Sequence, residues 1–324
     1  MGKTSLAACV FVLFGPTASG KTEILRRLFT GSGRICPAEI VSADSMQVYK
    51  GLDIGTAKPN SALLAELPHH LIDICSPSEQ FNAGEFVRRA EIAIADIVQR
   101  GLLPVVSGGT GFYLKNLIEG LPESPPPDMS VRSALKTELE QKGADCLMQE
   151  LQAVDPVSAE RININDKYRL SRALEVFRST GKPLSSYAAS GRGDKEKYRF
   201  LCAGLEWERA ALFKRIELRC KEMFRMGLAD EVRALLQAGF TPDACPSLKA
   251  IGYNEFFVKK DDKYEVSDNT EAVEALVIRN SRRYAKRQIT WFKKVQNVQW
   301  IHLEENSKAI TNAVNTIAKI LENE

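Results

Sequence analysis

The sequence is poor in the features that mark secreted or metal-dependent proteins. Its seven cysteines form no C-x-x-C pair and have no closely spaced histidine partner. A disulfide framework or a zinc site is therefore not expected, and a reducing compartment accounts for the cysteines. The net charge of +3 is too small to indicate that the whole chain binds nucleic acid, so any basic surface must arise from local clusters.

Long hydrophobic runs are also missing. The N-terminal apolar run at 6–14 is too short to span a bilayer. It does not fit a secretion signal, because cleavage would fall near the glycine-rich loop that follows it. The remaining composition, with 44% hydrophobic and 26% charged residues over 324 positions, is typical of one large globular domain or a domain with an insertion. We therefore expect a cytoplasmic protein that makes no contact with a membrane.

The glycine-rich loop after the first apolar run is the most informative motif. Residues 15–22 have the sequence G-P-T-A-S-G-K-T, which matches the phosphate-loop pattern G-x-x-x-x-G-K-[ST]. Its glycines let backbone N–H groups turn toward a polyphosphate, Lys21 adds a point charge, and the Thr22 hydroxyl can bind Mg²⁺. The motif alone leaves open whether the diphosphate belongs to a nucleotide. The residues predicted to bind diphosphate are Gly15, Pro16, Thr17, Ala18, Ser19, Gly20, Lys21 and Thr22.

Short apolar runs alternate with helical patterns through the first 120 residues. The predicted strands are 10–14, 39–42, 70–74 and 103–107, and the predicted helices are 23–29 and 84–99. This alternation predicts an α/β fold, a parallel sheet flanked by helices like that of P-loop NTPases. Ligands of such sheets bind at the carboxyl ends of the strands, where Gly15, Asp44 and residues 108–110 are expected.

The pattern changes after the proline-rich segment L-P-E-S-P-P-P-D at 121–128, which cannot continue a helix or a central strand. Residues 129–177 have helical patterns without strands, residues 179–198 are polar and glycine-rich, and an apolar strand returns at 199–206. We therefore expect a core that carries a mainly helical insertion. The expected core is 1–122 and 199–324, the insertion is 123–198, and further helices are predicted at 209–238 and 272–294.

Two of the predicted strand ends carry residues suited to chemistry. Asp44 follows the second strand beside the phosphate loop, where it can act as a general base, bind a metal or cap a turn. Gly108 and Gly109 permit close approach of a ligand, or only a tight turn between strand and helix. No strand that ends in Asp is followed by a catalytic Glu, and no kinase-type lid is recognisable, which weakens an ATP-dependent interpretation.

Basic residues cluster in two segments. Residues 161–199 contain ten Lys and Arg against four Asp and Glu, a surplus of six positive charges. Residues 279–294 contain seven cations and no acid, with three aromatic residues interleaved. One such cluster is often only a solvated helix face. Two, with aromatic residues, favour a surface for a phosphate backbone.

Arg215 and Arg219 form a separate cationic pair. Their spacing of four residues lets one helix face present both guanidinium groups to a diphosphate. Ion pairs with Glu217 or Glu222 are the alternative.

Together these motifs resemble the tRNA dimethylallyltransferase (isopentenyl-tRNA transferase) family over nearly the whole chain. Besides the phosphate loop, the longest matches are S-A-D-S-M-Q-V-Y-K-G-L-D-I-G-T-A-K-P at 42–59 and Y-A-K-R-Q-I-T-W-F at 284–292. The resemblance is to bacterial members, because no zinc-finger segment follows Trp300. Shorter matches are H-H-L-I-D-I at 69–74, G-G-T-G-F-Y-L at 108–114, R-L-S-R-A-L-E-V at 169–176 and A-I-G-Y-N-E at 250–255.

The resemblance implies transfer of a dimethylallyl group from dimethylallyl diphosphate to N6 of adenosine 37 in tRNA, with Mg²⁺ as cofactor, by a monomer. It implies that Asp44 is the general base and that the phosphate loop, with Lys21 and Thr22, holds the diphosphate and Mg²⁺. Arg215 or Arg219, with Arg219 preferred, would stabilise the departing diphosphate. The residues implied to contact tRNA are Asp44, Ser45, Met46, Gln47, Thr110, Arg132, Tyr168, Arg169, Leu170, Ser171, Arg172, Lys249, Ala250, Ile251, Gly252, Tyr253 and Asn254.

Three other functions fit parts of the sequence. An adenylate isopentenyltransferase, which prenylates free AMP, ADP or ATP, needs neither two basic surfaces nor the insertion. A P-loop kinase of a small metabolite needs ATP and an acceptor pocket. A non-catalytic RNA-binding module accounts for the basic helices but not for a phosphate loop beside Asp44. The motifs taken together favour the tRNA enzyme.

Overall fold

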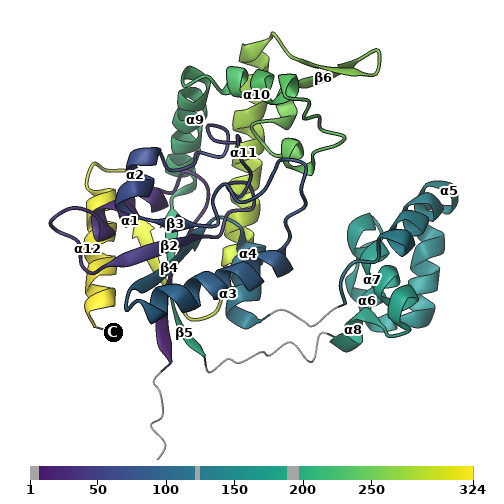
Figure 1. Ribbon diagram of the computed structural model, residues 1–324, viewed down its shortest axis with the longest axis horizontal. Helices are drawn as coiled ribbons and strands as arrows, with labels where there is room; N and C mark the ends of the chain where they lie inside the picture. Colours follow the sequence, from purple (N-terminus) through teal and green to yellow (C-terminus); the bar gives the residue numbers. More distant parts are fainter. Residues whose placement is uncertain (1–6, 121–124, 188–196, 324) are drawn as a thin grey trace, which may run out of the picture. The chain divides into compact units, whose positions relative to one another are not determined.

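The computed structural model describes residues 7–120, 125–187 and 197–323, and it divides the chain into two compact units (Figure 1). The first unit is Met1–Ile118 with Glu196–Glu324, and the second is Glu119–Lys195. The inserted unit therefore begins at 119 and ends at 195, where the sequence indicated 123 and 198. The proline-rich segment at 121–128 and the polar stretch at 179–198 lie partly outside the described residues.

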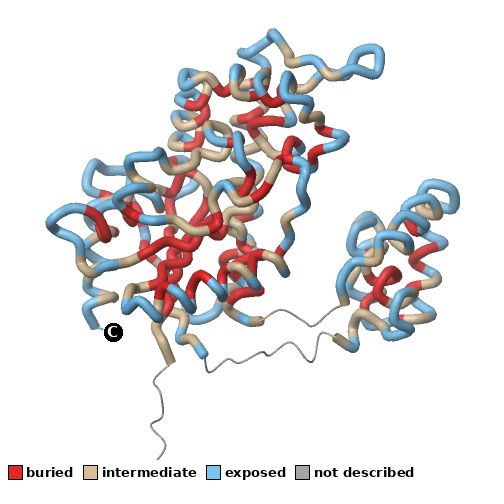
Figure 2. Tube along the Cα trace, in the orientation of Figure 1, coloured by how far each residue is buried: buried red, intermediate tan, exposed pale blue. Residues whose placement is uncertain are grey.

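The first unit contains a six-stranded sheet in which neighbouring strands are parallel, in the order β3-β2-β4-β1-β5-β8. Residues 10–14 of β1 are completely buried, as expected for a central strand covered on both faces. Buried residues follow these strands through the unit (Figure 2). The strands are β1 Ala8–Phe14, β2 Ala38–Ser42, β3 His69–His70, β4 Leu103–Gly108, β5 Tyr198–Trp207 and β8 Val298–Leu303.

Helices flank this sheet (Figure 1), and the predicted α/β class is confirmed. Helix α3 packs on β2 and β4, α1 packs against α12, and α9 packs against α11. The helices are α1 Lys21–Phe29, α2 Ser61–Glu66, α3 Ala83–Gln99, α4 Gly111–Glu119, α9 Arg209–Arg225, α10 Leu228–Gln237, α11 Thr270–Phe292 and α12 Ala309–Glu322. Two 3₁₀ turns, Pro246–Lys249 and Asn254–Phe256, precede an antiparallel hairpin of β6 Phe257–Lys260 and β7 Lys263–Val266.

Two predicted elements differ from the structure. The strand predicted at 70–74 ends at His70, because Leu71 and Asp73 adopt positive φ angles of 64° and 54°, which a strand cannot accommodate. The helix predicted at 209–238 is broken into α9 and α10. Gly227 lies between them with φ 95°, a left-handed conformation that suits glycine.

The described part of the second unit is helical and has its own core. Leu135, Leu151, Leu170 and Leu174 are completely buried there. Asp128 begins the first helix of the unit by accepting hydrogen bonds from two backbone N–H groups of its first turn. The helices are α5 Met129–Val154, α6 Pro156–Arg161, α7 Lys167–Thr180 and α8 Leu184–Tyr187.

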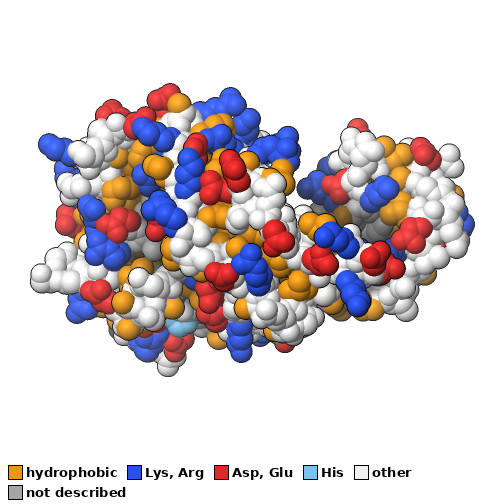
Figure 3. Space-filling view, turned by 90° about the horizontal axis from the view of Figure 1, so that it is seen from above, with side chains coloured by type: hydrophobic (Ala, Val, Ile, Leu, Met, Phe, Trp, Pro, Cys, Tyr) orange, Lys and Arg blue, Asp and Glu red, His pale blue; other side chains and the backbone are white. Residues whose placement is uncertain are grey.

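Charged side chains of both signs are scattered over the visible face of the first unit, among apolar and uncharged groups (Figure 3). Along α11 and the residues just after it, most cations of the cluster at 279–294 are exposed. Arg282 differs, because it pairs with Glu217 at 2.7 Å. Across 7–120, 125–187 and 197–323, no helix combines the length and the apolar character that crossing a membrane requires.

Candidate active site

The phosphate loop connects β1 to α1 at the carboxyl edge of the sheet. Ala18 and Gly20 both have left-handed φ angles, 61° and 97°, and the Ser19 N–H donates to the Pro16 carbonyl at 3.2 Å. Within the described chain no side chain caps the N-terminus of α1. Its first backbone N–H groups are therefore available to an anion, as the motif predicts.

Lys21 is folded back onto its own loop. Its ammonium donates to the carbonyls of Gly15 and Pro16 at 2.9 and 3.0 Å and lies 3.4 Å from the Ser19 hydroxyl. Burial, reinforced by the positive charge of Arg219, lowers the pKa of Lys21 to about 7. Among the described residues the ammonium donates only to neutral oxygens, and a bound diphosphate would give it a negatively charged partner.

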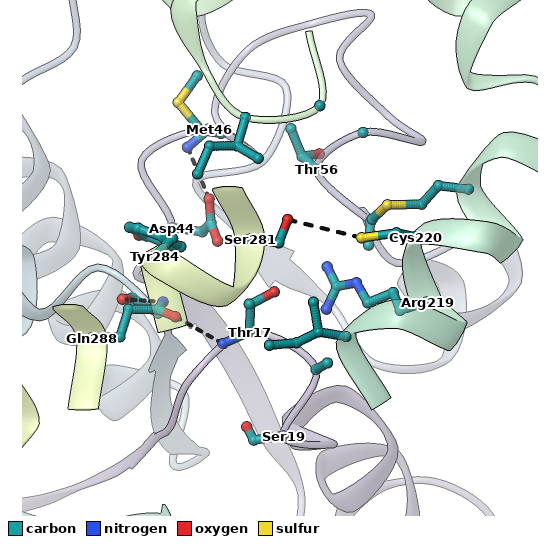
Figure 4. Close-up of a pocket in the computed structure, with 18 of the residues that line it drawn as sticks. Thr17, Ser19, Asp44, Met46, Thr56, Arg219, Cys220, Ser281, Tyr284 and Gln288 are labelled. Atoms are coloured by element: carbon teal, nitrogen blue, oxygen red, sulfur yellow. Dashed lines mark hydrogen bonds between the residues drawn. The ribbon is translucent and has the colours of Figure 1, made fainter. Parts of the chain in front are cut away.

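Asp44 follows β2 and uses one carboxylate oxygen to hold its own turn. Oδ1 accepts the N–H groups of Met46 and Gln47 at 2.9 and 3.3 Å, so the turn-capping role considered above is present. In the described part of the chain Oδ2 has no hydrogen-bond partner. Asp44 also lines a cavity at this edge of the sheet (Figure 4). Burial of the Tyr284 ring and the negative charge of Asp44 raise the pKa of Tyr284 to about 12. Capping and chemistry are therefore compatible at this residue.

The glycine pair at the end of β4, Gly108 and Gly109, serves close packing of protein loops. A Cβ at Gly108 would lie 2.1 Å from the Ala43 carbonyl oxygen, so only glycine fits there. A Cβ at Gly109 would lie 2.5 Å from the side-chain nitrogen of Gln288. The Thr110 N–H donates to the Ala43 carbonyl at 3.1 Å, and its hydroxyl oxygen accepts the Ser45 N–H at 3.0 Å. This loop therefore holds the backbone on both sides of Asp44.

Helix α9 presents Arg215 and Arg219 to the same cavity, and their environments differ. Arg215 donates to the Ala18 carbonyl at 2.8 Å, and its guanidinium lies 4.5 Å from the ring centroid of Trp207. Arg219 points into the cavity (Figure 4) and makes no hydrogen bond or ion pair with any residue that the structure describes. Burial lowers the pKa of both groups.

The alternative role for these arginines, pairing with neighbouring glutamates, is wrong. Glu217 pairs with Lys221 and Arg282, and Glu222 pairs with Arg225. Arg219 is therefore free to bind a ligand, which supports the preference for it over Arg215.

The cavity has a volume of about 670 Å³ and lies wholly within the first unit. This size suits a drug-sized ligand. Apolar side chains of Ile216, Met223 and Val277 form part of its wall, next to the charged groups. The wall is formed by residues 17–23, 44–47, 55–57, 109, 215–216, 218–220, 223, 249–252, 277, 281, 284 and 287–288.

In the first unit, some of the residues implied to contact tRNA line the cavity and others do not. Residues 44–47 and 249–252 line the cavity, and Thr110 contacts the Asp44 loop. Tyr253 is completely buried and donates its hydroxyl to Glu231 at 2.7 Å, so its side chain cannot reach an RNA. Asn254 is exposed but is not part of the cavity wall.

In the second unit, two of the implied arginines share one buried acid. Arg132 and Arg172 bind opposite oxygens of the Glu175 carboxylate at 3.0 and 2.8 Å. Leu170 is completely buried in the unit's core, so its side chain cannot contact RNA. Ser171 is partly buried. Tyr168 is 72% exposed, and Arg169 is exposed and pairs with Asp166, its one ion-pair partner among the described residues, so these two are accessible.

Several residues of the site were not found from the sequence. Gln288, Tyr284 and Ser281 line the cavity from α11 (Figure 4). They lie in or beside the Y-A-K-R-Q-I-T-W-F segment, in which Tyr284 was counted only as an aromatic residue of the basic cluster and no site role was predicted for Ser281 or Gln288. Their spacing of three and four residues was the signal that could have placed them on one helix face.

A metal ion would have few protein ligands at this site. Throughout the described ranges no group of three or more His, Cys, Asp or Glu is placed to hold an ion. Thr22 lines the cavity and is exposed. Because Mg²⁺ usually binds phosphate oxygens and water with only one or two protein groups, the Thr22 hydroxyl fits such an ion.

A phosphate loop after a buried parallel strand, with ligand groups gathered at the carboxyl edge of a parallel sheet, defines an α/β protein of the P-loop type. The family model described as "IPP transferase" matches residues 47–295. The chain belongs to this family, and the resemblance inferred from the motifs is confirmed.

Relatives with similar sequences carry consistent names. A tRNA dimethylallyltransferase of Geobacter sulfurreducens is 43% identical over 93% of this chain and 94% of its own length. The tRNA dimethylallyltransferase 2 of Geotalea uraniireducens is 44% identical over 94% of this chain and 96% of its own length.

Solved structures agree with the sequence comparisons. The tRNA isopentenylpyrophosphate transferase of Bacillus halodurans has a TM-score of 0.64 and 35% identity, and the match covers 97% of each chain. A eukaryotic dimethylallyltransferase acting on tRNA has a TM-score of 0.76 and 26% identity, with coverage of 98% of this chain and 80% of that one.

Proposed function

We propose that this protein transfers a dimethylallyl group from dimethylallyl diphosphate to N6 of adenosine 37 in tRNA, giving N6-(dimethylallyl)adenosine and diphosphate. The names of its relatives support this activity, and the chain covers more than nine-tenths of their length. The observation that carries the proposal is one cavity that holds the free Asp44 oxygen together with Lys21 and Arg219. It combines a proton acceptor with cations suited to a leaving diphosphate.

Asp44 acts as the general base. The exocyclic amine of adenine is a weak nucleophile, so it must be positioned and must lose a proton as the new bond forms. N6 attacks C1 of the dimethylallyl group, the C1–O bond to diphosphate breaks, and the N6 proton passes to Oδ2 of Asp44. Oδ1 remains bonded to the turn and fixes the direction of the carboxylate.

The diphosphate leaves with a charge that the phosphate loop and α9 stabilise. Arg219 and Lys21 lie in the cavity wall and stabilise this negative charge, and the first N–H groups of α1 add their dipoles. Arg215, which is bonded to the Ala18 carbonyl, holds the shape of the loop. The Thr22 hydroxyl would hold Mg²⁺, which when bound supplies further neutralisation of the diphosphate oxygens.

The apolar part of the cavity accommodates the five-carbon group. Ile216, Met223 and Val277 provide a surface without charge. Adenosine stacked in an anticodon loop cannot reach this depth, so the base must flip out, at a cost of a few kcal/mol. Residues 44–47 and 249–252, which line the cavity, would contact the flipped nucleotide.

The RNA backbone binds to basic groups outside the cavity. The exposed cations of α11 provide such a surface in the first unit, and Tyr168 with Arg169 provides one in the second. We infer that the protein works as a monomer in the bacterial cytoplasm. The free-nucleotide enzyme is the second candidate, but the exposed cations of both units favour an acceptor with many phosphates.

A labelled acceptor assay tests this function. The protein is incubated with Mg²⁺ and labelled dimethylallyl diphosphate, and either tRNA or AMP is added as acceptor. Label in tRNA supports the proposal, and label in AMP supports the adenylate enzyme. Label in neither acceptor would contradict both.

A further inference from the structure

Gln288 joins the phosphate loop to the loop after β4. Its side chain is 5% exposed, its Oε1 accepts the Thr17 N–H at 2.9 Å, and its Nε2 donates to the Gly109 carbonyl at 2.8 Å (Figure 4). Both ends of the amide are thus occupied by backbone groups. Gly109 leaves the space that the amide requires.

The hydrogen-bonded path continues from this bridge to the catalytic carboxylate. Gly109 is followed by Thr110, whose N–H and hydroxyl oxygen bind the backbone of Ala43 and Ser45. These two residues flank Asp44. Gln288 and, through the adjacent Gly109, Thr110 therefore connect the loop that would hold the leaving group to the loop that carries the general base.

Gln288 is carried by a helix whose other side is basic. Ser281, Tyr284 and Gln288 line the cavity, whereas Arg283 and Lys286 on the same helix are exposed. An RNA backbone that binds these cations contacts the element that holds the two loops together. The proposed RNA-binding cations outside the cavity and the bridge inside it are thus carried by the same helix.

We propose that Gln288 is a positioning residue that sets the distance between the phosphate loop and Asp44. The inference rests on the proposed function and adds a residue to it. Gln288 does not touch the reacting atoms, because both of its polar ends are used by the protein backbone. Its contribution is alignment, and misplacement by about 1 Å can cost on the order of 100-fold in rate.

Removal of the Gln288 amide, compared with a matched control on the same helix, tests the bridge. Gln288→Met keeps the length of the side chain and removes both hydrogen bonds, and we expect kcat with saturating substrates to fall about 100-fold. The Kd for tRNA should stay close to that of the wild type, because the basic face is unchanged. Thr290→Val, which removes a hydroxyl from an exposed position of the same helix, is the matched control and should leave kcat unchanged.

Gln288→Glu provides a signature that a merely structural role would not give. A protonated carboxyl can accept from Thr17 and donate to Gly109, as the amide does, whereas a carboxylate opposes the Gly109 carbonyl. The rate of this variant relative to the wild type should therefore rise as the pH falls. Asp44, Lys21, Tyr284 and Arg287 also line this cavity, so the ratio at each pH is compared with the same ratio for Gln288→Met.

Activity and fold are measured together. A fall in kcat for folded Gln288→Met, with an acid-dependent recovery confined to Gln288→Glu, supports the inference. A folded Gln288→Met whose kcat stays within about threefold of the wild type overturns it. A wild type that transfers no label to tRNA overturns the proposed function itself, so the two failures are distinguishable.

Discussion

The Glu231 carboxylate accepts the Tyr253 hydroxyl at 2.7 Å and also binds three successive backbone N–H groups, those of Asp53, Ile54 and Gly55, at 3.0, 2.7 and 3.2 Å. The Tyr253 ring packs so closely on Gly55 that a Cβ there would lie 2.5 Å from it. Burial, followed by the charge of Glu231, raises the pKa of Tyr253. A loop that forms one wall of the cavity is thus held by α10.

Replacing Glu231 should lower the free energy of unfolding of the first unit. Glu231→Ala removes four hydrogen bonds and leaves a buried hydroxyl without its acceptor, so we expect a loss of about 2–4 kcal/mol in the free energy of unfolding. Asp230→Ala, at an exposed neighbour, is the control and should change it by less than about 0.5 kcal/mol. Urea titration followed by tryptophan fluorescence measures this, because the three tryptophans all lie in the first unit. Equal stability of the two variants would contradict the anchoring role.

Asp44→Asn should separate turn capping from catalysis. The asparagine carbonyl can still accept the N–H groups of Met46 and Gln47, but an amide cannot take the N6 proton. We expect kcat to fall by about 10²–10⁴-fold while the Kd for tRNA stays within about twofold. Single-turnover kinetics and a filter-binding assay measure the two quantities. An unchanged kcat would remove Asp44 from the role of base.

Arg219→Gln should lower kcat alone, whereas Arg215→Gln should also lower the thermal stability of the protein. Arg219 has no described partner to lose, so its removal should lower kcat about 10²–10³-fold without destabilising the fold. Arg215 loses its bond to the Ala18 carbonyl and its contact with Trp207, so its removal should also lower the melting temperature. Steady-state kinetics and thermal unfolding of both variants test this contrast. If the two residues exchange these effects, the assignment is reversed.

Diphosphate binding should take up a proton near neutral pH. In the free protein the pKa of Lys21 is about 7, so above that pH much of this side chain is neutral. A bound diphosphate favours the charged ammonium and raises the pKa, and affinity therefore falls as the pH rises above about 7. Calorimetry in two buffers of different ionisation enthalpy counts the protons. Lys21→Met should show no such uptake above the pH range in which the ligand itself titrates.

Local sequence features were sufficient to predict the sheet edge and its phosphate loop. The loop at 15–22 and Asp44 depend on neighbours within a few residues, and pattern and propensity determine such positions. The strand at 70–74 was predicted too long because positive φ angles at Leu71 and Asp73 are not visible in an apolar pattern. Gly227 was an available signal for the break between α9 and α10.

Contacts between distant residues limited the prediction of the site. Thr17 and Gln288 are 271 positions apart, so no local pattern joins them. The implied tRNA contacts were carried over as continuous stretches, which included Leu170 and Tyr253, whose side chains are completely buried. A helix or turn buries some members of any such stretch, and the structure identifies which ones.

Mass spectrometry of the treated tRNA tests the central claim most directly. Unmodified tRNA and AMP are incubated together with the protein, Mg²⁺ and dimethylallyl diphosphate. The tRNA is then digested to oligonucleotides and nucleosides, and the AMP is analysed beside it. We predict N6-(dimethylallyl)adenosine at position 37 alone with the wild-type protein, and a strongly reduced amount with Asp44→Asn. Prenylation at another position, or unmodified tRNA beside prenylated AMP in the same reaction, would contradict the account.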